Sequence, residues 1–324
     1  LFLGALRGSI RAEEGLEKLQ AELYLESLAL AGRKARVRLR TLRGGRTLQR
    51  GEYGLVLGWG SLSAKSAAIR APGPGWDWKL RGLTLGDSAS VRDGQLIYQC
   101  RLRVRQWQTG EQSFGPLDAT LTLARLDAAE LSKAAARLNE LRASYDPSDS
   151  ASRERFADQA REALVEVARA RPRLELTVKL SQGDEWAWAD LRMAIDSERI
   201  TSPASLKRVN RVTRWVATLR APAAMLEQVL RSGVDSYARV APHLALDSEE
   251  KRAELYRNLI DGILHNDLLT RDDEGYKGRL EWTGKGTLLN GKPISPWTVI
   301  KLVAIAKALQ GPDAEKPYRS GPPT

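Results

Sequence analysis

The stretch Tyr98-Gln99-Cys100-Arg101-Leu102-Arg103-Val104-Arg105 decides the fold class. Small or apolar side chains alternate there with polar or charged ones, which is the period of a β-strand with one face on a core and the other in water. The same alternation recurs over residues 36–41, 120–123 and 174–180. Residues 1–125 are therefore predicted to form successive antiparallel strands.

Short turn signals separate the predicted strands. Asp93-Gly94 predicts a two-residue hairpin, Gly44-Gly45 a break between two strands, and Gly183-Asp184 a further turn. Within residues 23–30 the parity of the apolar positions switches after Leu25. One extra residue at that point would account for the switch, so we expect a β-bulge there.

Helical periodicity interrupts the strands. Asp127 stands where an N-cap belongs, ahead of a first helix, and a second helix is predicted over residues 152–170. A strand is expected from residue 210, and Pro222 and Gly233 bracket another helix. A longer helix after Asp247 and a hairpin closed by Asn290-Gly291 follow.

These patterns predict an α+β, β-rich protein. We expect extended, twisted or curved antiparallel sheets, with amphipathic helices packed on one face or at the ends. The expected units, in chain order, are an antiparallel β module, a helical pair, a second α+β module, a C-terminal helix and a disordered tail, over residues 1–125, 126–172, 173–295, 296–310 and 311–324.

Composition limits the compartment and the partners. The chain has 324 residues, a net charge of +11 and one cysteine, Cys100, so an internal disulfide is excluded. The positive charge favours anionic partners, but no zinc-finger, RNA-recognition or phosphate-loop pattern occurs, which argues against nucleic acid. No apolar run reaches the length of about 18 residues that spans a bilayer. The first residues lack an initiator Met and are expected to continue a longer chain.

Catalytic constellations are absent from the sequence pattern. His243 and His265 are the two histidines, far too few for a metal centre, and Cys100 has no histidine beside it in sequence. The acidic turn Asp272-Asp273-Glu274 is typical of solvated surface, although it leaves a hydrolase of envelope polymers as a minor alternative. We predict no enzymatic activity, no cofactor and no metal.

Two arginine rows and one amphipathic segment are the candidate binding features. Each row places its cations on one face of a strand, which suits either a solvated, cross-strand paired surface or a face for an anionic ligand; the rows are Arg36, Arg38, Arg40 and Arg101, Arg103, Arg105. The C-terminal helix would carry an apolar stripe and an interfacial tryptophan at Trp297, Val299, Ile300 and Val303. At about 21 Å it is too short to span a membrane. It would pack on the chain's own sheet, on a membrane surface or in a partner's groove.

Three blocks together resemble the YdgA-like family of bacterial envelope proteins. They are Gly82-Leu83-Thr84-Leu85 before the Asp93-Gly94 pair, Phe114-Gly115-Pro116-Leu117 before Leu126-Asp127, and Leu288-Leu289-Asn290-Gly291-Lys292-Pro293. The resemblance covers roughly residues 80–295 in order and spacing. It implies a protein without an established reaction, anchored in the inner membrane by a segment outside this chain, with its bulk in the periplasm.

Two functions remain open from the sequence. The first is a non-enzymatic periplasmic module that binds another envelope protein or itself, since exposed sheet edges can pair by strand addition. The second is a carrier of lipid or another anionic amphiphile, held along a curved β-sheet groove.

Overall fold

The computed structural model describes residues 2–295 apart from residues 14, 16, 33–35, 72–75, 110–111, 241–247 and 266. The predictions for His243, for the cap at Asp247, for the C-terminal helix with Trp297, Val299, Ile300 and Val303, and for the tail lie outside the described residues. Within them the chain forms one open antiparallel sheet with helices at its ends, which confirms the β-rich α+β class. Whether residues 1–125 and 173–295 fold as separate modules stays a prediction.

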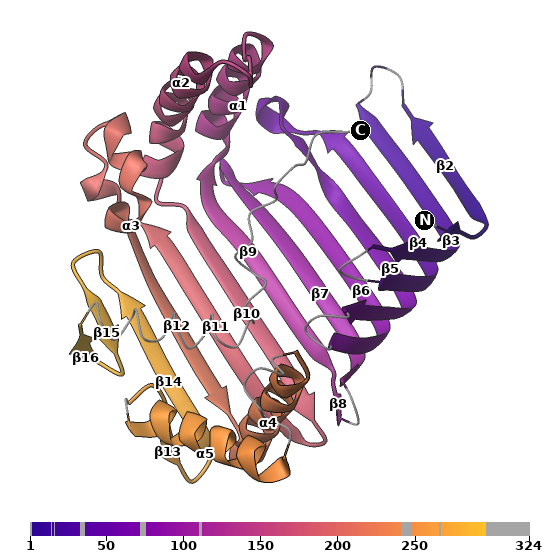
Figure 1. Cartoon of the computed structure of the whole chain (residues 1–324). Coiled ribbons are helices and arrows are strands. Elements are labelled where there is room, and N and C mark those ends of the chain that lie inside the picture. The colour runs from indigo at the N-terminus through magenta and orange to yellow at the C-terminus, as the bar shows by residue number, and fades with distance from the viewer. Residues whose placement is uncertain are drawn as a thin grey trace.

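The first nine strands that the structure describes include the longest ones of the sheet (Figure 1). They are β1 (Phe2–Leu3), β2 (Leu6–Ala12), β3 (Lys18–Ala31), β4 (Arg36–Arg50), β5 (Val56–Ala71), β6 (Trp76–Arg92), β7 (Gln95–Thr109), β8 (Gln112–Phe114) and β9 (Leu117–Asp127). The Asp93–Gly94 turn forms as predicted, because both residues adopt the positive φ that a tight hairpin requires. The predicted break at Gly44-Gly45 is wrong, since β4 runs straight through both glycines.

Shorter strands and the helices complete the fold. The strands are β10 (Arg173–Gln182), β11 (Glu185–Ile195), β12 (Thr213–Ala221), β13 (Thr270–Asp272), β14 (Gly275–Trp282), β15 (Thr287–Leu289) and β16 (Lys292–Ile294). The helices are α1 (Ala128–Ala143), α2 (Ser150–Arg169), α3 (Val209–Val212), α4 (Ala223–Val240) and α5 (Glu249–His265). The strand expected from residue 210 begins at Thr213, after the short helix α3, and α4 continues past Gly233.

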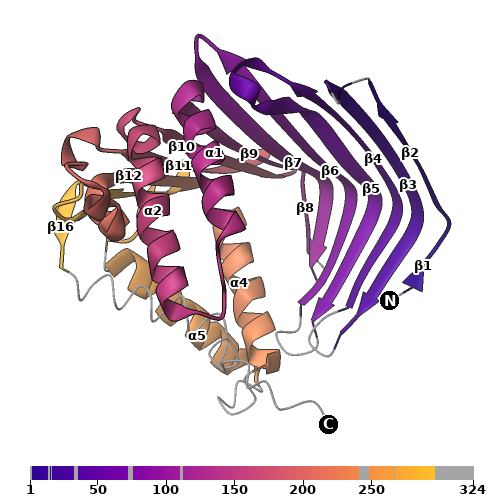
Figure 2. The ribbon, with the colours of Figure 1, turned by 90° about the horizontal axis from the view of Figure 1, so that it is seen from above.

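Local capping explains where α1 and α2 begin. The Asp127 side chain accepts a hydrogen bond from the backbone N–H of Glu130 at 3.0 Å, which confirms the predicted N-cap. Asp149 accepts from the backbone N–H groups of Ala151 and Ser152 in the same way. Figures 1 and 2 show α1 and α2 at one end of the strands and α4 and α5 at the other, on the same side of the sheet.

A crease crosses the five longest strands and bends them (Figure 2). One residue of each strand is left out of the ladder between continuous stretches of pairing; the crease residues are Glu26, Thr41, Lys65, Gly82 and Arg105. Thr41 and Gly82 have positive φ. The register is the same on both sides of the crease, so no residue is added and the β-bulge predicted after Leu25 is wrong. The parity of the apolar positions switches where Glu26 and Thr41 leave the ladder.

The crease makes a core without a second layer. Residues three apart would face opposite sides of a regular strand, but across the crease they share one face. Leu25, Leu42 and Ala64 are buried there and pack against Leu28 and Leu39, on the other side of the crease. The inside of the bend is therefore the concave face of the sheet. There, apolar side chains on one side of the crease are buried against apolar side chains on the other side. A second cluster joins α2 to the β11–β12 connection through Val165, Ala168, Ile200 and Val212.

Candidate functional site

The concave face carries an apolar row that crosses the sheet. Directly paired residues of antiparallel strands point to the same face, so the register defines the row. Its members are glycines, alanines, a valine and leucines only: Gly8, Leu23, Gly44, Leu62, Leu85, Leu102, Ala119, Val178, Ala189, Leu219 and Gly278. At about 4.8 Å per strand, the row extends for roughly 50 Å along the curved sheet.

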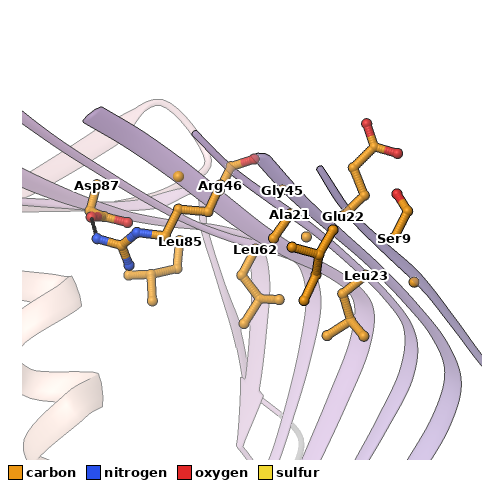
Figure 3. A pocket seen from close by; sticks show the side chains of 14 residues that line it. Ser9, Ala21, Glu22, Leu23, Gly45, Arg46, Leu62, Leu85 and Asp87 are labelled. Carbon is orange, nitrogen blue, oxygen red and sulfur yellow. Dashed lines mark hydrogen bonds and ion pairs between the residues drawn. The ribbon is translucent and has the colours of Figure 1, made fainter. Parts of the chain in front are cut away.

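The first part of this row forms an N-terminal groove of about 620 Å³ over β2 to β6. Figure 3 shows Leu23, Leu62 and Leu85 pointing to one side of the sheet, while Ser9 and Glu22 point to the other. The three leucines are 40%, 38% and 40% exposed. Large apolar side chains left open in a contiguous line are typical of interaction surfaces and of ligand-binding grooves.

One ion pair borders the N-terminal groove. Arg46 Nη2 donates to Asp87 Oδ2 at 2.9 Å (Figure 3). Gly60, which lies between them in the register, makes this possible: a Cβ there would lie 2.9 Å from Asp87 Oδ1. The paired charges cancel, so the groove keeps an apolar floor with one polar edge.

The last part of the row forms a C-terminal groove of about 460 Å³ over β10 to β15. Its floor includes Leu176, Leu191 and Leu280, and the segment Leu268-Leu269 borders it. Gly278 admits this segment, because a Cβ on that residue would stand 2.6 Å from Leu269 Cδ2. The C-terminal groove lies on the same face as the N-terminal groove, so one concave surface contains both.

The sequence analysis allowed for a groove on a curved sheet but did not identify the residues of this row, although their signal was present. Each strand shows the alternation, but the row exists only once eleven strands are aligned in register. Gly44 illustrates the difficulty: a glycine pair inside a strand resembles a turn, whereas here a Cβ would approach Leu62 Cδ1 to 3.0 Å.

The two predicted arginine rows lie on the convex face, on opposite sides of the crease. Arg36, Arg38 and Arg40 are exposed and make no ion pair with any described residue. Arg101 and Arg103 both donate to Asp118, with Nε–carboxylate distances of 2.9 and 3.1 Å.

Arg101 and Arg103 of the second row are therefore paired across strands with Asp118, which is one of the two arrangements that the sequence allowed. Hydrogen bonds from Arg101 and then Arg103 hold the pKa of the Asp118 carboxyl below its ordinary value. Arg105 belongs to the crease and is exposed. The structure does not bring the two rows together, and an anionic-ligand face on either stays a prediction.

The remaining candidate groups are dispersed. Asp272 binds Lys277 Nζ at 2.7 Å and Glu274 pairs with Arg220, so the exposed acidic turn is tied to neighbouring cations. Cys100 is half-buried in β7. In the described part of the chain, no three His, Cys, Asp or Glu side chains gather to hold a metal ion. None of the described helices combines the length and apolar composition needed to cross a bilayer.

Comparison with known proteins places the chain in a family. A family model described as a bacterial protein of unknown function (DUF945) matches residues 2–296, nearly the whole described fold, so the protein belongs to that family. No curated protein matches the chain significantly. The family defines a class of bacterial proteins and assigns no reaction to the concave face.

Proposed function

We propose that this protein binds the acyl chain of an amphiphile along its concave face, as a non-enzymatic carrier. The observation that supports this is the apolar row, with Leu23, Leu62 and Leu85 each more than a third exposed on a face framed by helices and by the bent strands. A soluble protein rarely leaves such a line uncovered without a ligand.

The shape of the row favours a flexible hydrocarbon over a protein surface. Gly8 and Gly44 alternate with Leu23 and Leu62 across the strands, so the floor drops to the backbone between the leucine side chains. A hydrocarbon chain can follow this relief, and each buried methylene contributes about 0.8 kcal/mol. The net charge of +11 complements an anionic head group.

Native mass spectrometry of gently extracted protein tests the proposal, together with displacement of a fluorescent fatty acid. Leu85→Gln should weaken fatty-acid binding at least about tenfold, because it puts an amide into the groove. Trp59→Gln is the control, since Trp59 is 57% exposed on the convex face and should not affect binding. Absence of both co-purified lipid and fatty-acid binding would reject the proposal.

A competing hypothesis is that the chain's own C-terminal residues occupy the groove. Truncation after Pro293 distinguishes the two: tighter fatty-acid binding in the truncated protein would mean that residues 294–324 compete for the concave face. Unchanged binding would leave the acyl chain as the occupant.

Self-association through β2 is the second candidate function. All seven residues of β2 are exposed, Ile10 is 76% exposed, and β2 pairs only with β3 among the described strands. An exposed strand edge of this kind can add a strand from a second molecule. Sedimentation should then detect a dimer that Ile10→Lys dissociates; a monomer at all concentrations would contradict this function.

We propose the bacterial envelope as the setting, following the YdgA-like resemblance. A protein anchored in the inner membrane with its bulk in the periplasm would meet lipids and other envelope proteins. Fractionation of cells that produce the full-length gene product checks this, and recovery in the cytosol would contradict it.

A further inference from the structure

A cationic cavity of about 1000 Å³ lies beside the C-terminal groove. The β11–β12 connection and the β14–β15 turn form it, and β12 pairs with β14, which brings these two distant segments together. Its cations are Arg199, Lys207, Arg208, Arg211 and Lys285.

The cavity keeps an excess of positive charge. Arg199 binds Asp196 at 3.0 Å and Lys207 binds Asp158 at 3.1 Å, so these two cations are neutralised. Arg208, Arg211 and Lys285 make no ion pair with any described residue. Three like charges sharing one cavity repel one another, and an anion would relieve that repulsion.

The backbone holds one arginine of the cavity wall in place. Gly284 has a φ of +76°, and a Cβ on it would lie 2.0 Å from Arg199 Nη1. Arg199 is held in place by donating to the carbonyl oxygen of Arg211 at 3.0 Å. Ser202 and Ser205 add hydroxyl groups to the wall. Fixed arginine forks with nearby hydroxyl donors are suited to phosphate oxygens.

The cavity continues the C-terminal groove. Leu280 lines the groove and Trp282 lines the cavity, two residues farther along β14 on the same face, which is a step of about 7 Å. Trp215 is paired with Trp282, so two tryptophans stand at the boundary. Tryptophan suits a position between an apolar and a polar environment.

We propose that this cavity binds the phosphate head group of the amphiphile whose acyl chain lies in the C-terminal groove. This inference rests on the proposed function and adds the ligand's head-group chemistry and its orientation. The acyl chain points along the apolar row, and the phosphate ester contacts Arg208, Arg211 and Lys285.

Competition binding with two single-chain amphiphiles tests the assignment. Lysophosphatidic acid carries a phosphate monoester, and the monoacylglycerol with the same acyl chain carries an uncharged head. The full chain should prefer lysophosphatidic acid by at least about tenfold, because charge-assisted hydrogen bonds to phosphate are strong. Arg208→Gln combined with Arg211→Gln should abolish this preference and leave monoacylglycerol affinity unchanged.

A matched control separates this site from general electrostatic attraction. Arg36→Gln combined with Arg38→Gln removes the same charge from the convex face and should keep the preference. Thermal unfolding of both double variants, expected to match that of the unchanged protein, shows that any loss is not misfolding.

The possible failures are distinguishable. Equal binding of both amphiphiles overturns the head-group site while the acyl-chain proposal stands. Failure of both to bind rejects the proposed function and this inference with it. Inorganic phosphate that binds through Arg208 and Arg211 when neither amphiphile binds would assign the cavity to a free phosphate instead and overturn the head-group assignment.

Discussion

The two halves of the sheet are stabilised by different means. In the N-terminal half, strands of 14 to 17 residues bend at the crease. The apolar side chains on the two sides of the crease bury one another. In the C-terminal half, where β10 to β12 have 9 to 11 residues, the cluster around Val165 and Ile200 comes from a helix and a strand connection at the strand ends. Both arrangements leave the middle of the concave face open, so this sheet gains a core without covering that face.

Removing an apolar side chain that is buried next to the crease should have the largest effect. Leu42 is 8% exposed inside the bend, so Leu42→Ala should lower the free energy of unfolding by about 2–5 kcal/mol through lost burial and a cavity. Leu62→Ala, in the next row of the same face, should cost less than about 1 kcal/mol because Leu62 is already 38% exposed. Chemical denaturation measures both values, and equal losses would contradict the division between core and groove.

Leu42→Ala also tests whether the halves unfold together. The ladder is continuous from β7 through β9 to β10, so hydrogen exchange should show β11 and β12 losing protection along with β4 and β5. Loss confined to the first half would mean that two cooperative units share one sheet.

The backbone of the crease should be the next most sensitive feature. Gly82 and Gly183 share a φ of +61°, but a Cβ on Gly82 would lie 2.9 Å from Arg105 Cβ, whereas nothing lies within 4 Å of one on Gly183. Gly183→Ala should therefore cost about 1 kcal/mol for the left-handed backbone alone. Gly82→Ala should cost about 2 kcal/mol or more. Equal losses in chemical denaturation would show that the close approach at the crease is unimportant.

This contrast also explains what could be predicted from the sequence. The strands, the Asp93–Gly94 hairpin and the Asp127 cap depend on neighbours in the chain, and each was predictable. The crease depends instead on contacts between neighbouring strands. Thr41 has a positive φ although it is β-branched, and no residue next to it in the sequence indicates that conformation. The available signal was a repeated spacing, with apolar residues three apart at Leu25 and Leu28 and again at Leu39 and Leu42.

The candidate site was harder to predict for the same reason. The apolar row takes one residue from each of eleven strands, and the cationic cavity joins Arg208 and Arg211 to Lys285 only through the pairing of β12 with β14. The arginine rows stood out because their residues are close in sequence, yet they lie on the convex face. Proximity along the chain therefore drew attention to the convex face and away from the concave one.

A buried hydrogen bond of the C-terminal half should have a moderate effect. Tyr276 is 1% exposed, and its hydroxyl donates to Glu227 Oε1 at 3.1 Å, which ties β14 to α4. Tyr276→Phe should cost about 0.5–1.5 kcal/mol at neutral pH, because the bond is lost and the carboxylate loses a donor. Chemical denaturation at pH 7 measures this, and no loss would mean that helix α4 is held by its other contacts.

The same substitution should change the alkaline stability. Burial, and next the hydrogen bond to Glu227, raise the pKa of Tyr276 above its ordinary value of 10.0. The folded protein therefore keeps the phenolic proton at a pH where the unfolded chain loses it. This contribution is complete below pH 10 and is lost as the pH rises through the folded-state pKa, so the unchanged protein should lose stability there more steeply than Tyr276→Phe.

The smallest effects should come from two surface carboxylates, Asp118 on the convex face of the N-terminal half and Asp272 in the C-terminal half. Asp118→Asn removes the negative charge that Arg101 and Arg103 share, whereas Asp272→Asn removes the negative charge that forms an ion pair with Lys277. Asp118→Asn should therefore destabilise the protein slightly more at pH 7. The lowered pKa of Asp118 sets the sign of the pH dependence: its contribution is present above the ordinary value of 3.8 and is lost as the pH falls through the folded-state pKa. Unfolding titrations at pH 7 and at progressively lower pH should show the variant converging on the unchanged protein. A difference that persisted in acid would mean that Asp118 acts through packing, and that its arginine pairing contributes nothing to this half of the sheet.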